Sequence, residues 1–271
     1  MNYIKISFNS GEQQLRDILV ASLAEMDFEG FEEEAETLHA YIPEDKMDGD
    51  ALSALAERYA VPFAQQVIPR RNWNAQWEAG FRPVIIPGFC TVRAAFHDIP
   101  VTTPHELVIT PKMSFGTGHH DTTLLMMEQM RDHDFREQQV LDFGTGTGIL
   151  AILAARLGAA TVHGIDNDEW SYENAQENAA VNQCSNVTFS CGSLEAAAGN
   201  AYDVILANIN RHILLAHLHG LYRSLKKGGR LLMSGVLESD AGELRAAAAA
   251  AGFDYRCQAA RNGWLVMAFE K

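Results

Sequence analysis

The sequence contains no apolar run approaching the roughly 20 residues that a membrane-spanning helix needs, although hydrophobic residues make up 47% of its 271 positions. Its first residues, Met-Asn-Tyr-Ile-Lys-Ile, also lack the long apolar core of a signal peptide. We therefore expect no membrane contact and a cytoplasmic location. The length exceeds one typical domain, so it predicts two domains or one enlarged domain with a substantial core.

Cysteine is scarce, and its four residues are Cys90, Cys184, Cys191 and Cys257. They do not form the closely spaced pairs that hold zinc, and nothing indicates the disulfide framework of a small secreted domain. The adjacent His119 and His120 have no acidic or cysteine ligands at supporting spacing. We therefore expect no metal site.

Basic residues are also in deficit. Lys and Arg number 21 against 35 Asp and Glu, which gives a formal net charge of −14. This balance opposes binding to nucleic acid, because such binding depends on clustered Lys and Arg. The acidic surplus would attract a basic partner, but a role in solubility alone explains it equally well. The composition leaves both interpretations open.

The most informative segment is Val140–Leu150, which reads Val-Leu-Asp-Phe-Gly-Thr-Gly-Thr-Gly-Ile-Leu. A short apolar run leads into Asp142, glycines alternate from Gly144 to Gly148, and helix-forming residues follow. Because glycine has no Cβ, such a loop lets the backbone approach a ligand closely, and the helix start directs free N–H groups at it. The dinucleotide fingerprint requires glycine at its first, third and sixth positions, whereas the sixth position here is Ile149.

A second strand, Ala159–Ile165, is predicted to end at Asp166 in the sequence His-Gly-Ile-Asp-Asn-Asp. In doubly wound folds a carboxylate at this place, about twenty residues beyond the glycines, binds ribose hydroxyls, because it accepts from both hydroxyls at once. Asp166, Asn167 and Asp168 also precede the predicted helix Glu169–Val181, so N-capping is the alternative role. We expect Asp166 to bind the ribose and another of the three to cap the helix.

Residues 1–68 predict a small α+β domain. Apolar periodicity indicates the order β-α-β-β-α-β, which is the ferredoxin-like arrangement. The segments are Tyr3–Phe8, Gln13–Met26, Gly30–Glu34, Thr37–Ile42, Ala51–Tyr59 and Ala64–Ile68. Residues 69–80 predict a linker helix with Trp73 and Trp77 one turn apart. These tryptophans would pin the linker to a neighbouring domain or serve ordinary packing.

Residues 81–271 predict a larger domain in which strands and helices alternate, and such alternation favours a mainly parallel sheet. Further predicted strands are Val84–Ile86, Thr91–Phe96, Leu107–Thr110, Val187–Ser190, Asp203–Ala207 and Arg230–Val236. A helix over Ile213–Leu225 is expected to be stopped by Gly228-Gly229. Two terminal strands, Tyr255–Ala260 and Trp264–Glu270, are joined by Arg261-Asn-Gly, which is a hairpin signal.

Alternating glycines after an acidic residue resemble the first motif of class I S-adenosylmethionine-dependent methyltransferases. Nearly the whole chain also resembles the bacterial methyltransferases that modify large-subunit ribosomal protein eleven. The matching segments are Trp73–Trp77, Phe115-Gly-Thr-Gly-His-His-Asp-Thr-Thr123, Val140–Leu150, Gly164–Asp168 and Ala207–Ile209. The chain departs from the family pattern at Asp121, where some members carry Pro, and at Thr110-Pro-Lys112.

This resemblance implies an α/β fold with two parts. A ferredoxin-like substrate-recognition domain over residues 1–68 would precede a Rossmann-like methyltransferase domain over residues 81–271. The sheet of the second domain would have seven strands, mainly parallel, with a terminal antiparallel hairpin.

The resemblance also implies which residues bind S-adenosylmethionine, namely Phe115, Thr123, Asp142, Gly144, Gly146, Asp166 and Asn208. Thr122 and Thr123 would open a helix whose hydroxyls and free N–H groups meet the methionine carboxylate, and capping of that helix is the alternative. Phe115 would pack on the cofactor or gate the substrate channel, and simple loop packing is equally compatible with its position.

Asn208 follows the fourth strand, at the edge where ligands bind in open α/β sheets. Related enzymes that methylate amide or ring nitrogens carry Asn/Asp-Pro-Pro-Tyr/Phe there, whereas this chain has Asn208-Ile-Asn210. The missing prolines and aromatic residue favour an aliphatic amine, which the Asn208 carbonyl would orient for methylation. A turn residue is the alternative.

The resemblance implies that the enzyme methylates lysine side chains and the terminal amine of ribosomal protein eleven, and we expect a monomer. Two other functions stay open. One is a methyltransferase for another protein or a small molecule, and the other is a binding protein that has lost turnover.

Overall fold

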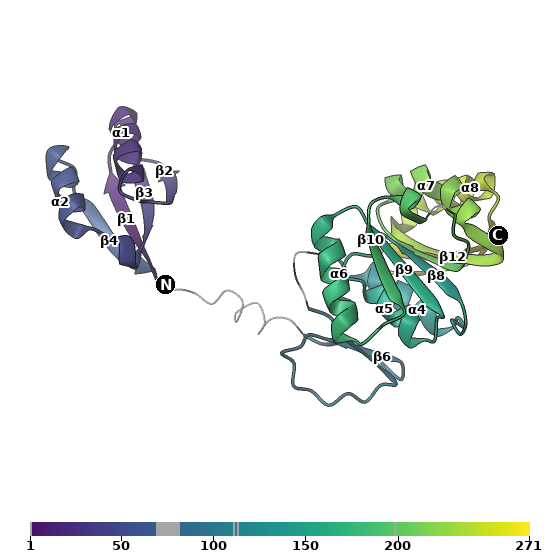
Figure 1. Cartoon of the computed structure of the whole chain (residues 1–271). Coiled ribbons are helices and arrows are strands. Elements are labelled where there is room, and N and C mark those ends of the chain that lie inside the picture. Colours follow the sequence, from purple (N-terminus) through teal and green to yellow (C-terminus); the bar gives the residue numbers. More distant parts are fainter. Residues whose placement is uncertain (1, 69–81, 111, 113, 198) are drawn as a thin grey trace. The chain divides into compact units, whose positions relative to one another are not determined.

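The structure, a computed structural model, describes residues 2–68, 82–110, 112, 114–197 and 199–271. The chain divides into two compact units, Met1–Gly80 and Phe81–Lys271, which are drawn in Figure 1 and described here one at a time. The linker helix predicted for residues 69–80, with Trp73 and Trp77, lies outside the described residues. Within the described ranges, none of the helices has the length and apolar character to cross a membrane.

Between residues 2 and 68, the first unit contains one four-stranded antiparallel sheet and two α-helices. Its elements are β1 (Tyr3–Asn9), α1 (Gln13–Ala24), β2 (Gly30–Glu34), β3 (Thr37–Pro43), the short 3-10 helix η1 (Glu44–Lys46), α2 (Gly49–Arg58) and β4 (Phe63–Ile68). The strand order is β2-β3-β1-β4. Ile4, Ile6 and Phe8 of β1 are buried in one cluster with Leu19 of α1 and Leu52 of α2, because alternate strand residues face the same side. The predicted ferredoxin-like arrangement is confirmed.

The second unit is built on a seven-stranded sheet. Its elements before the glycine loop are β5 (Val84–Ile86), β6 (Cys90–Arg93), β7 (His105–Val108), α4 (Asp121–Arg131) and β8 (Gln139–Phe143). Those after it are α5 (Ile149–Arg156), β9 (Thr161–Asp166), α6 (Glu169–Val181), β10 (Val187–Cys191), η2 (Leu194–Ala197), β11 (Tyr202–Asn208), α7 (Arg211–Ser224), β12 (Leu225–Leu237), η3 (Glu238–Asp240), α8 (Ala241–Ala251), β13 (Asp254–Arg261) and β14 (Trp264–Glu270).

The large sheet has the order β10-β9-β8-β11-β12-β14-β13. Its first five strands are parallel, and β14 is antiparallel to both of its neighbours. The turn of this final hairpin contains Asn262 and Gly263, both with positive φ, as a two-residue hairpin turn requires. The predicted class, a mainly parallel seven-stranded sheet with a terminal antiparallel hairpin, is confirmed.

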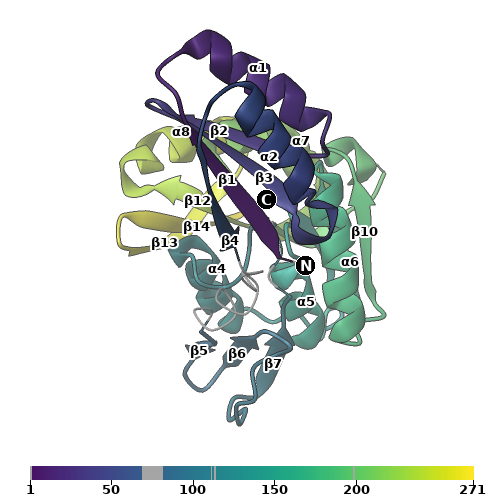
Figure 2. The same cartoon turned by 90° about the vertical axis from the view of Figure 1, so that its left-hand side faces the viewer.

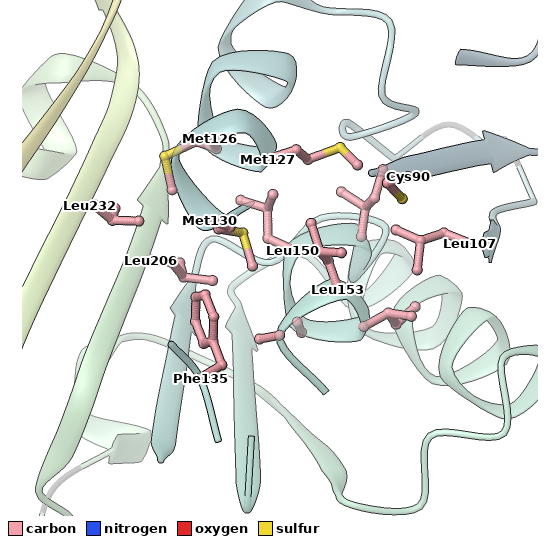
Figure 3. Close-up of a cluster of buried hydrophobic side chains, with 14 of the residues drawn as sticks. Cys90, Leu107, Met126, Met127, Met130, Phe135, Leu150, Leu153, Leu206 and Leu232 are labelled. Atoms are coloured by element: carbon pink, nitrogen blue, oxygen red, sulfur yellow. The ribbon is translucent and has the colours of Figure 1, made fainter. Parts of the chain in front are cut away.

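Helices cover both faces of the large sheet. On one face lie α4, α5 and α6, and on the other lie α7 and α8 (Figure 1). Met126 and Met130 of α4 pack with Leu150 and Leu153 of α5 in the buried cluster of the first face (Figure 3). The small sheet of β5, β6 and β7 lies beside α5 (Figure 2) and adds Leu107 to the same cluster.

Three strand predictions in this unit are wrong in detail. The helix α7 ends at Ser224, one residue before its predicted end, but β12 starts at Leu225 instead of Arg230 and runs through both glycines. These glycines hydrogen-bond to the last residue: Gly228 N donates to Lys271 O at 2.7 Å, and Lys271 N donates to Gly229 O at 2.9 Å. The strands predicted to reach Phe96 and Thr110 stop earlier, at Arg93 and Val108.

Candidate active site at the carboxyl edge of the sheet

A cavity of about 560 Å³ opens where the parallel strands end. Its aromatic and apolar lining comprises Phe115, Phe143, Ile165, Ile209, Ile213 and Trp264. Its polar lining comprises His120, Thr122, Asp166, Asn167, Ser171, Ser193, Asn208, Asn210 and His217, and Gly144, Gly146, Gly192 and Gly235 complete the wall. The cavity therefore contains five of the seven predicted cofactor residues, while Thr123 and Asp142 lie outside its lining.

The glycine loop joins β8 to α5 and forms part of this wall. Gly144, Gly146 and Gly148 all have positive φ, of 77°, 55° and 79°, which glycine adopts without strain. A Cβ on Gly146 would lie 2.3 Å from the carbonyl oxygen of Phe115, and one on Gly144 would lie 2.0 Å from Ile209 Cγ2. The loop thus needs glycine because two other wall segments pack directly on its backbone.

Asp142 hydrogen-bonds to this loop but is absent from the cavity lining. Its Oδ2 accepts from Thr145 Oγ1 at 2.7 Å and from Ala151 N at 3.1 Å, so it ties the loop to the start of α5. The side chain is 1% exposed, and this burial raises the pKa of Asp142 to about 7 despite the two hydrogen bonds. Asp142 is thus placed to fix the loop backbone rather than to line the cavity.

Asp166 lies at the end of β9 and lines the cavity. Its Oδ2 accepts from Gly146 N at 2.8 Å, and its Oδ1 accepts from Asp168 N at 3.1 Å. A carboxylate has about four acceptor sites, so both oxygens can still accept from ligand hydroxyls. The capping role belongs to Asp168, whose Oδ2 accepts from Ser171 N at 2.9 Å. The predicted division between a cap and a residue of the ligand cavity is therefore present.

Asn208 lies at the end of β11 and also lines the cavity. Its Nδ2 donates to Thr123 Oγ1 at 3.2 Å, and Thr123 is fully buried in the first turn of α4. The Asn208 Oδ1 atom is buried and has no hydrogen-bond partner among the described residues. Thr123 therefore orients the Asn208 amide from behind the wall, and the amide oxygen keeps its acceptor capacity.

Three rings form a continuous aromatic wall. The ring centroids of Phe115 and His120 are 5.2 Å apart, and those of His120 and Trp264 are 4.8 Å apart, both edge to face. His120 also caps α4, because its Nδ1 accepts from Thr122 N at 3.3 Å. Capping of this helix by Thr122 or Thr123, the alternative that the sequence left open, is wrong.

Several lining residues were missed from the sequence. Trp264 is the first residue of β14, directly after the hairpin turn. An aromatic residue next to that turn could have indicated from the sequence that Trp264 lines the cavity. Ser193 follows the end of β10, and His217 lies in α7 with its ring 5.2 Å from that of Phe143. No signal in the sequence alone marks His217, because its position depends on how α7 crosses the sheet.

The sequence profile described as "Ribosomal protein L11 methyltransferase (PrmA)" matches residues 9–271. The chain belongs to this family. A ribosomal protein L11 methyltransferase of Porphyromonas gingivalis is 42% identical over 260 residues, which cover 93% of this chain and 90% of that protein. One of Chlorobaculum tepidum is 36% identical and covers 88% of this chain and 86% of its own length. The crystal structure of a ribosomal protein L11 methylase from Lactobacillus delbrueckii subsp. bulgaricus matches with a TM-score of 0.65 and 27% identity, over 70% of this chain and 98% of that chain.

The cavity fits the cofactor of a class I methyltransferase. Among the described lining residues none is Lys or Arg, and Asp166 provides a carboxylate. This lining suits S-adenosylmethionine, which carries a ribose diol and a positive sulfur and has no phosphate. The orphaned Asn208 oxygen adds an acceptor for an N–H donor. The chain, as a ribosomal protein L11 methyltransferase family member, is an S-adenosylmethionine-dependent methyltransferase.

Proposed function

We propose that this enzyme transfers methyl groups from S-adenosylmethionine to the lysine side chains and the terminal amino group of ribosomal protein L11. The observation that carries the proposal is the Asn208 Oδ1 atom, which is buried at the cavity without a donor. An amine N–H group would supply that donor. The segment Asn208-Ile-Asn210 lacks the two prolines and the aromatic residue that hold a planar amide in related enzymes.

The cofactor would be held by the predicted residues that line the cavity. Asp166 would accept from the ribose hydroxyls, and the backbone around Gly144 and Gly146 would approach the ligand without side chains in between. Bound S-adenosylmethionine supplies an electrophilic methyl group on a positively charged sulfur. The first turn of α4, beginning at Asp121, would direct its free N–H groups to the carboxylate end.

The role of the remaining residues is to align and desolvate the amine. An ammonium with a reference pKa of about 10.4 needs about 4–5 kcal/mol to lose its proton at neutral pH. The wall of Phe115, His120 and Trp264 would shield one side of the amine from water, and partial desolvation lowers the pKa of an amine. Asn208 accepts from the amine and orients its lone pair, so alignment provides most of the catalysis, and water takes the proton.

The first unit would hold the substrate protein while the second unit performs methyl transfer. Its strand β2 carries the exposed residues Glu32 and Glu34, and the turn that follows carries the exposed Glu36, which suit a basic partner. This arrangement would let one bound substrate present several amines in turn. We place the enzyme in the cytoplasm, where ribosomal proteins are synthesised.

The test is mass spectrometry of ribosomal proteins from cells with and without this chain, followed by reaction of the purified enzyme with L11. We expect methylated lysines and a methylated terminal amine on L11 only when the enzyme is present. Asn208→Ala should lower turnover, whereas Asn210→Ala, which alters another cavity residue without the bond to Thr123, should not. Cofactor binding without turnover on any ribosomal protein would contradict the proposal, and methylation of a different protein would replace L11 as the substrate.

A further inference from the structure

Asn178 of α6 connects two segments that are distant in the sequence. Its Nδ2 donates to the carbonyl oxygen of Thr147 at 2.9 Å, and its Oδ1 accepts from Thr110 N at 2.9 Å. The side chain is fully buried, so both hydrogen bonds are shielded from water and costly to lose. Asn178 is absent from the cavity lining, and it therefore has no direct contact with the proposed ligands.

Thr147 belongs to the glycine loop, and its carbonyl oxygen accepts the hydrogen bond from Asn178. Its N–H donates to the carbonyl oxygen of Phe115 at 2.9 Å, and its Oγ1 donates to the carbonyl oxygen of Gly116. Thr147 is also fully buried. All its backbone and side-chain polar groups thus connect Asn178 on one side with the segment Phe115–His120 on the other. That segment carries two of the three rings of the aromatic wall.

We propose that Asn178 is a positioning residue for methyl transfer, which acts through Thr147 to hold the segment Phe115–His120 against the glycine loop. The contact is close enough to transmit a displacement. The Phe115 carbonyl oxygen lies 2.3 Å from where a Cβ on Gly146 would be, and a Cβ on Gly116 would lie 2.9 Å from Thr147 Oγ1. A shift of Thr147 therefore moves the aromatic wall relative to the cofactor side of the cavity.

Asn182 provides a matched control four residues further along the same helix. It is 2% exposed, its Oδ1 accepts from Val108 N at 2.9 Å, and its Nδ2 donates to Val108 O at 2.7 Å and to the backbone carbonyl of Asn178 at 2.8 Å. Like Asn178, it satisfies one backbone N–H and one carbonyl of a neighbouring segment. Unlike Asn178, it has no bond to the glycine loop. A purely structural role predicts similar consequences for the two residues.

The experiment compares Asn178→Leu with Asn182→Leu in the full chain, because leucine has the same number of side-chain heavy atoms and the same branch at Cγ as asparagine but makes none of its side-chain hydrogen bonds. Both variants should lose thermal stability to a similar extent. Asn178→Leu should lower kcat on L11 by about 10- to 100-fold, the loss expected when reacting groups are misplaced by about 1 Å, with KM for L11 unchanged. Asn182→Leu should keep most of its kcat. Equal losses of kcat in the two variants would overturn the positioning role.

A second measurement does not depend on the substrate. The activity assay rests on the proposed function, whereas amide hydrogen exchange of residues 115–120 and of Thr147 reports the contact itself. Exchange there should accelerate in Asn178→Leu and stay near the wild-type rate in Asn182→Leu, and unchanged exchange would refute the proposal. If the wild-type enzyme does not methylate L11 but the exchange difference appears, the proposed substrate is wrong and the positioning network stands.

A milder pair of variants applies if Asn178→Leu fails to fold. Thr147→Val removes the hydroxyl bond to Gly116 while it keeps the shape of the side chain, and Thr147→Ser keeps the hydroxyl. We expect Thr147→Val to lower kcat and to accelerate exchange of residues 115–120, and Thr147→Ser to restore both. Equal behaviour of the two variants would contradict the part of the connection that the Thr147 hydroxyl makes to the Gly116 carbonyl.

Discussion

Asp166 holds the glycine loop and is also expected to bind the cofactor. A substitution experiment must therefore distinguish these two roles. Its carboxylate fixes the glycine loop through Gly146 N and fixes its own turn through Asp168 N. The same oxygens line the cavity, where we expect them to accept from the cofactor ribose. Asp168, two residues later, makes only the capping contacts of α6 with Ser171, so it is the natural control.

Asp166→Ala should weaken S-adenosylmethionine binding by about 1.5–3 kcal/mol, which is the usual value of hydrogen bonds to a charged group. Asp168→Ala should cost about 1 kcal/mol of stability through the lost helix cap and leave cofactor affinity unchanged. Titration calorimetry on both folded variants measures the difference. Unchanged affinity in Asp166→Ala would show that this residue has only the loop-fixing role.

Asp142 gives the enzyme a distinctive dependence of stability on pH. Burial, with a smaller contribution from the charge of Asp166, raises the pKa of Asp142 to about 7 in the folded protein, against about 3.9 in an unfolded chain. The folded state therefore binds this proton more tightly than the unfolded state. This tighter proton binding adds to the free energy of unfolding. The added stability is fully present below about pH 4 and is lost as the pH rises toward 7.

We therefore expect the stability of the wild type to fall relative to that of Asp142→Asn between about pH 4 and pH 7, by at most about 1.4 kcal/mol per pH unit. Urea unfolding of both proteins at several pH values in this window gives the difference. Asp132→Asn, at a side chain that is 70% exposed, should show no such trend. A stability difference between Asp142→Asn and wild type that stays constant with pH would contradict the assignment.

Residue positions were predictable where strand ends and sequence motifs coincide. Asp166 and Asn208 end strands β9 and β11, so the parallel topology alone places both at the ligand edge. The sequence could not show that Thr123 and Asp142 lie outside the cavity lining. Which residues of a loop or helix start face the cavity depends on packing, and local sequence does not reveal it. Trp264 was missed because it lies in β14, an antiparallel strand that follows the alternating strands and helices on which the site prediction was based.

At the scale of elements, the active site depends on the interlocking of the glycine loop with the segment Phe115–His120. Gly146 has a φ of 55° and would place a Cβ 2.3 Å from the Phe115 carbonyl oxygen. Gly228 offers a comparison, because its φ is 77° and a Cβ there would meet nothing within 4 Å. Both glycines have left-handed backbone, but only Gly146 has a neighbouring segment to displace.

Gly228→Ala should cost about 1–2 kcal/mol of stability, the usual penalty of a left-handed conformation for an alanine, with normal cofactor binding. Gly146→Ala should have the same penalty and also push the Phe115 segment away, so cofactor affinity should fall by about tenfold or more. Thermal unfolding and calorimetry on the two variants provide the comparison. Near-normal affinity in Gly146→Ala would mean that the ligand does not depend on this contact.

Most elements could be predicted because their signals are local. The helix Glu169–Val181 matches its prediction, with Asp168 as its cap, and the hairpin follows from the pair Asn262-Gly263. The start of β12 could not be predicted, because the glycines pair with Lys271, which is distant in the sequence: Gly228 N donates to Lys271 O, and Lys271 N donates to Gly229 O. Long-range pairing overrides the local preference of glycine to end a helix.

At the scale of the whole molecule, each unit has its own buried core. The cluster of the first unit is formed by residues between Ile4 and Val61, and the two clusters of the second unit by residues between Ile86 and Phe269. The predicted cofactor contacts all belong to the second unit, whereas the acidic sheet surface belongs to the first. Of the acidic residues in β2, Glu33 is paired with Arg16 at 3.2 Å, while Glu34 lies 3.8 Å from His39 Nε2 and keeps 86% of its side chain exposed. A docking surface for a basic protein would therefore rely on Glu34 and its exposed neighbours.

A fragment of residues 82–271 should consequently bind S-adenosylmethionine with the affinity of the full chain but methylate intact L11 poorly. Its KM for L11 should rise strongly, because the postulated docking unit is gone, while a short lysine peptide should react equally with both proteins.

The activity of the full chain on L11 should also fall as salt increases, since exposed charges are screened, and the fragment should show less salt dependence. Circular dichroism and cofactor calorimetry first establish that the fragment is folded. If the folded fragment then equals the full chain on intact L11, the first unit is not a recognition domain, and the division of labour between the two units is wrong.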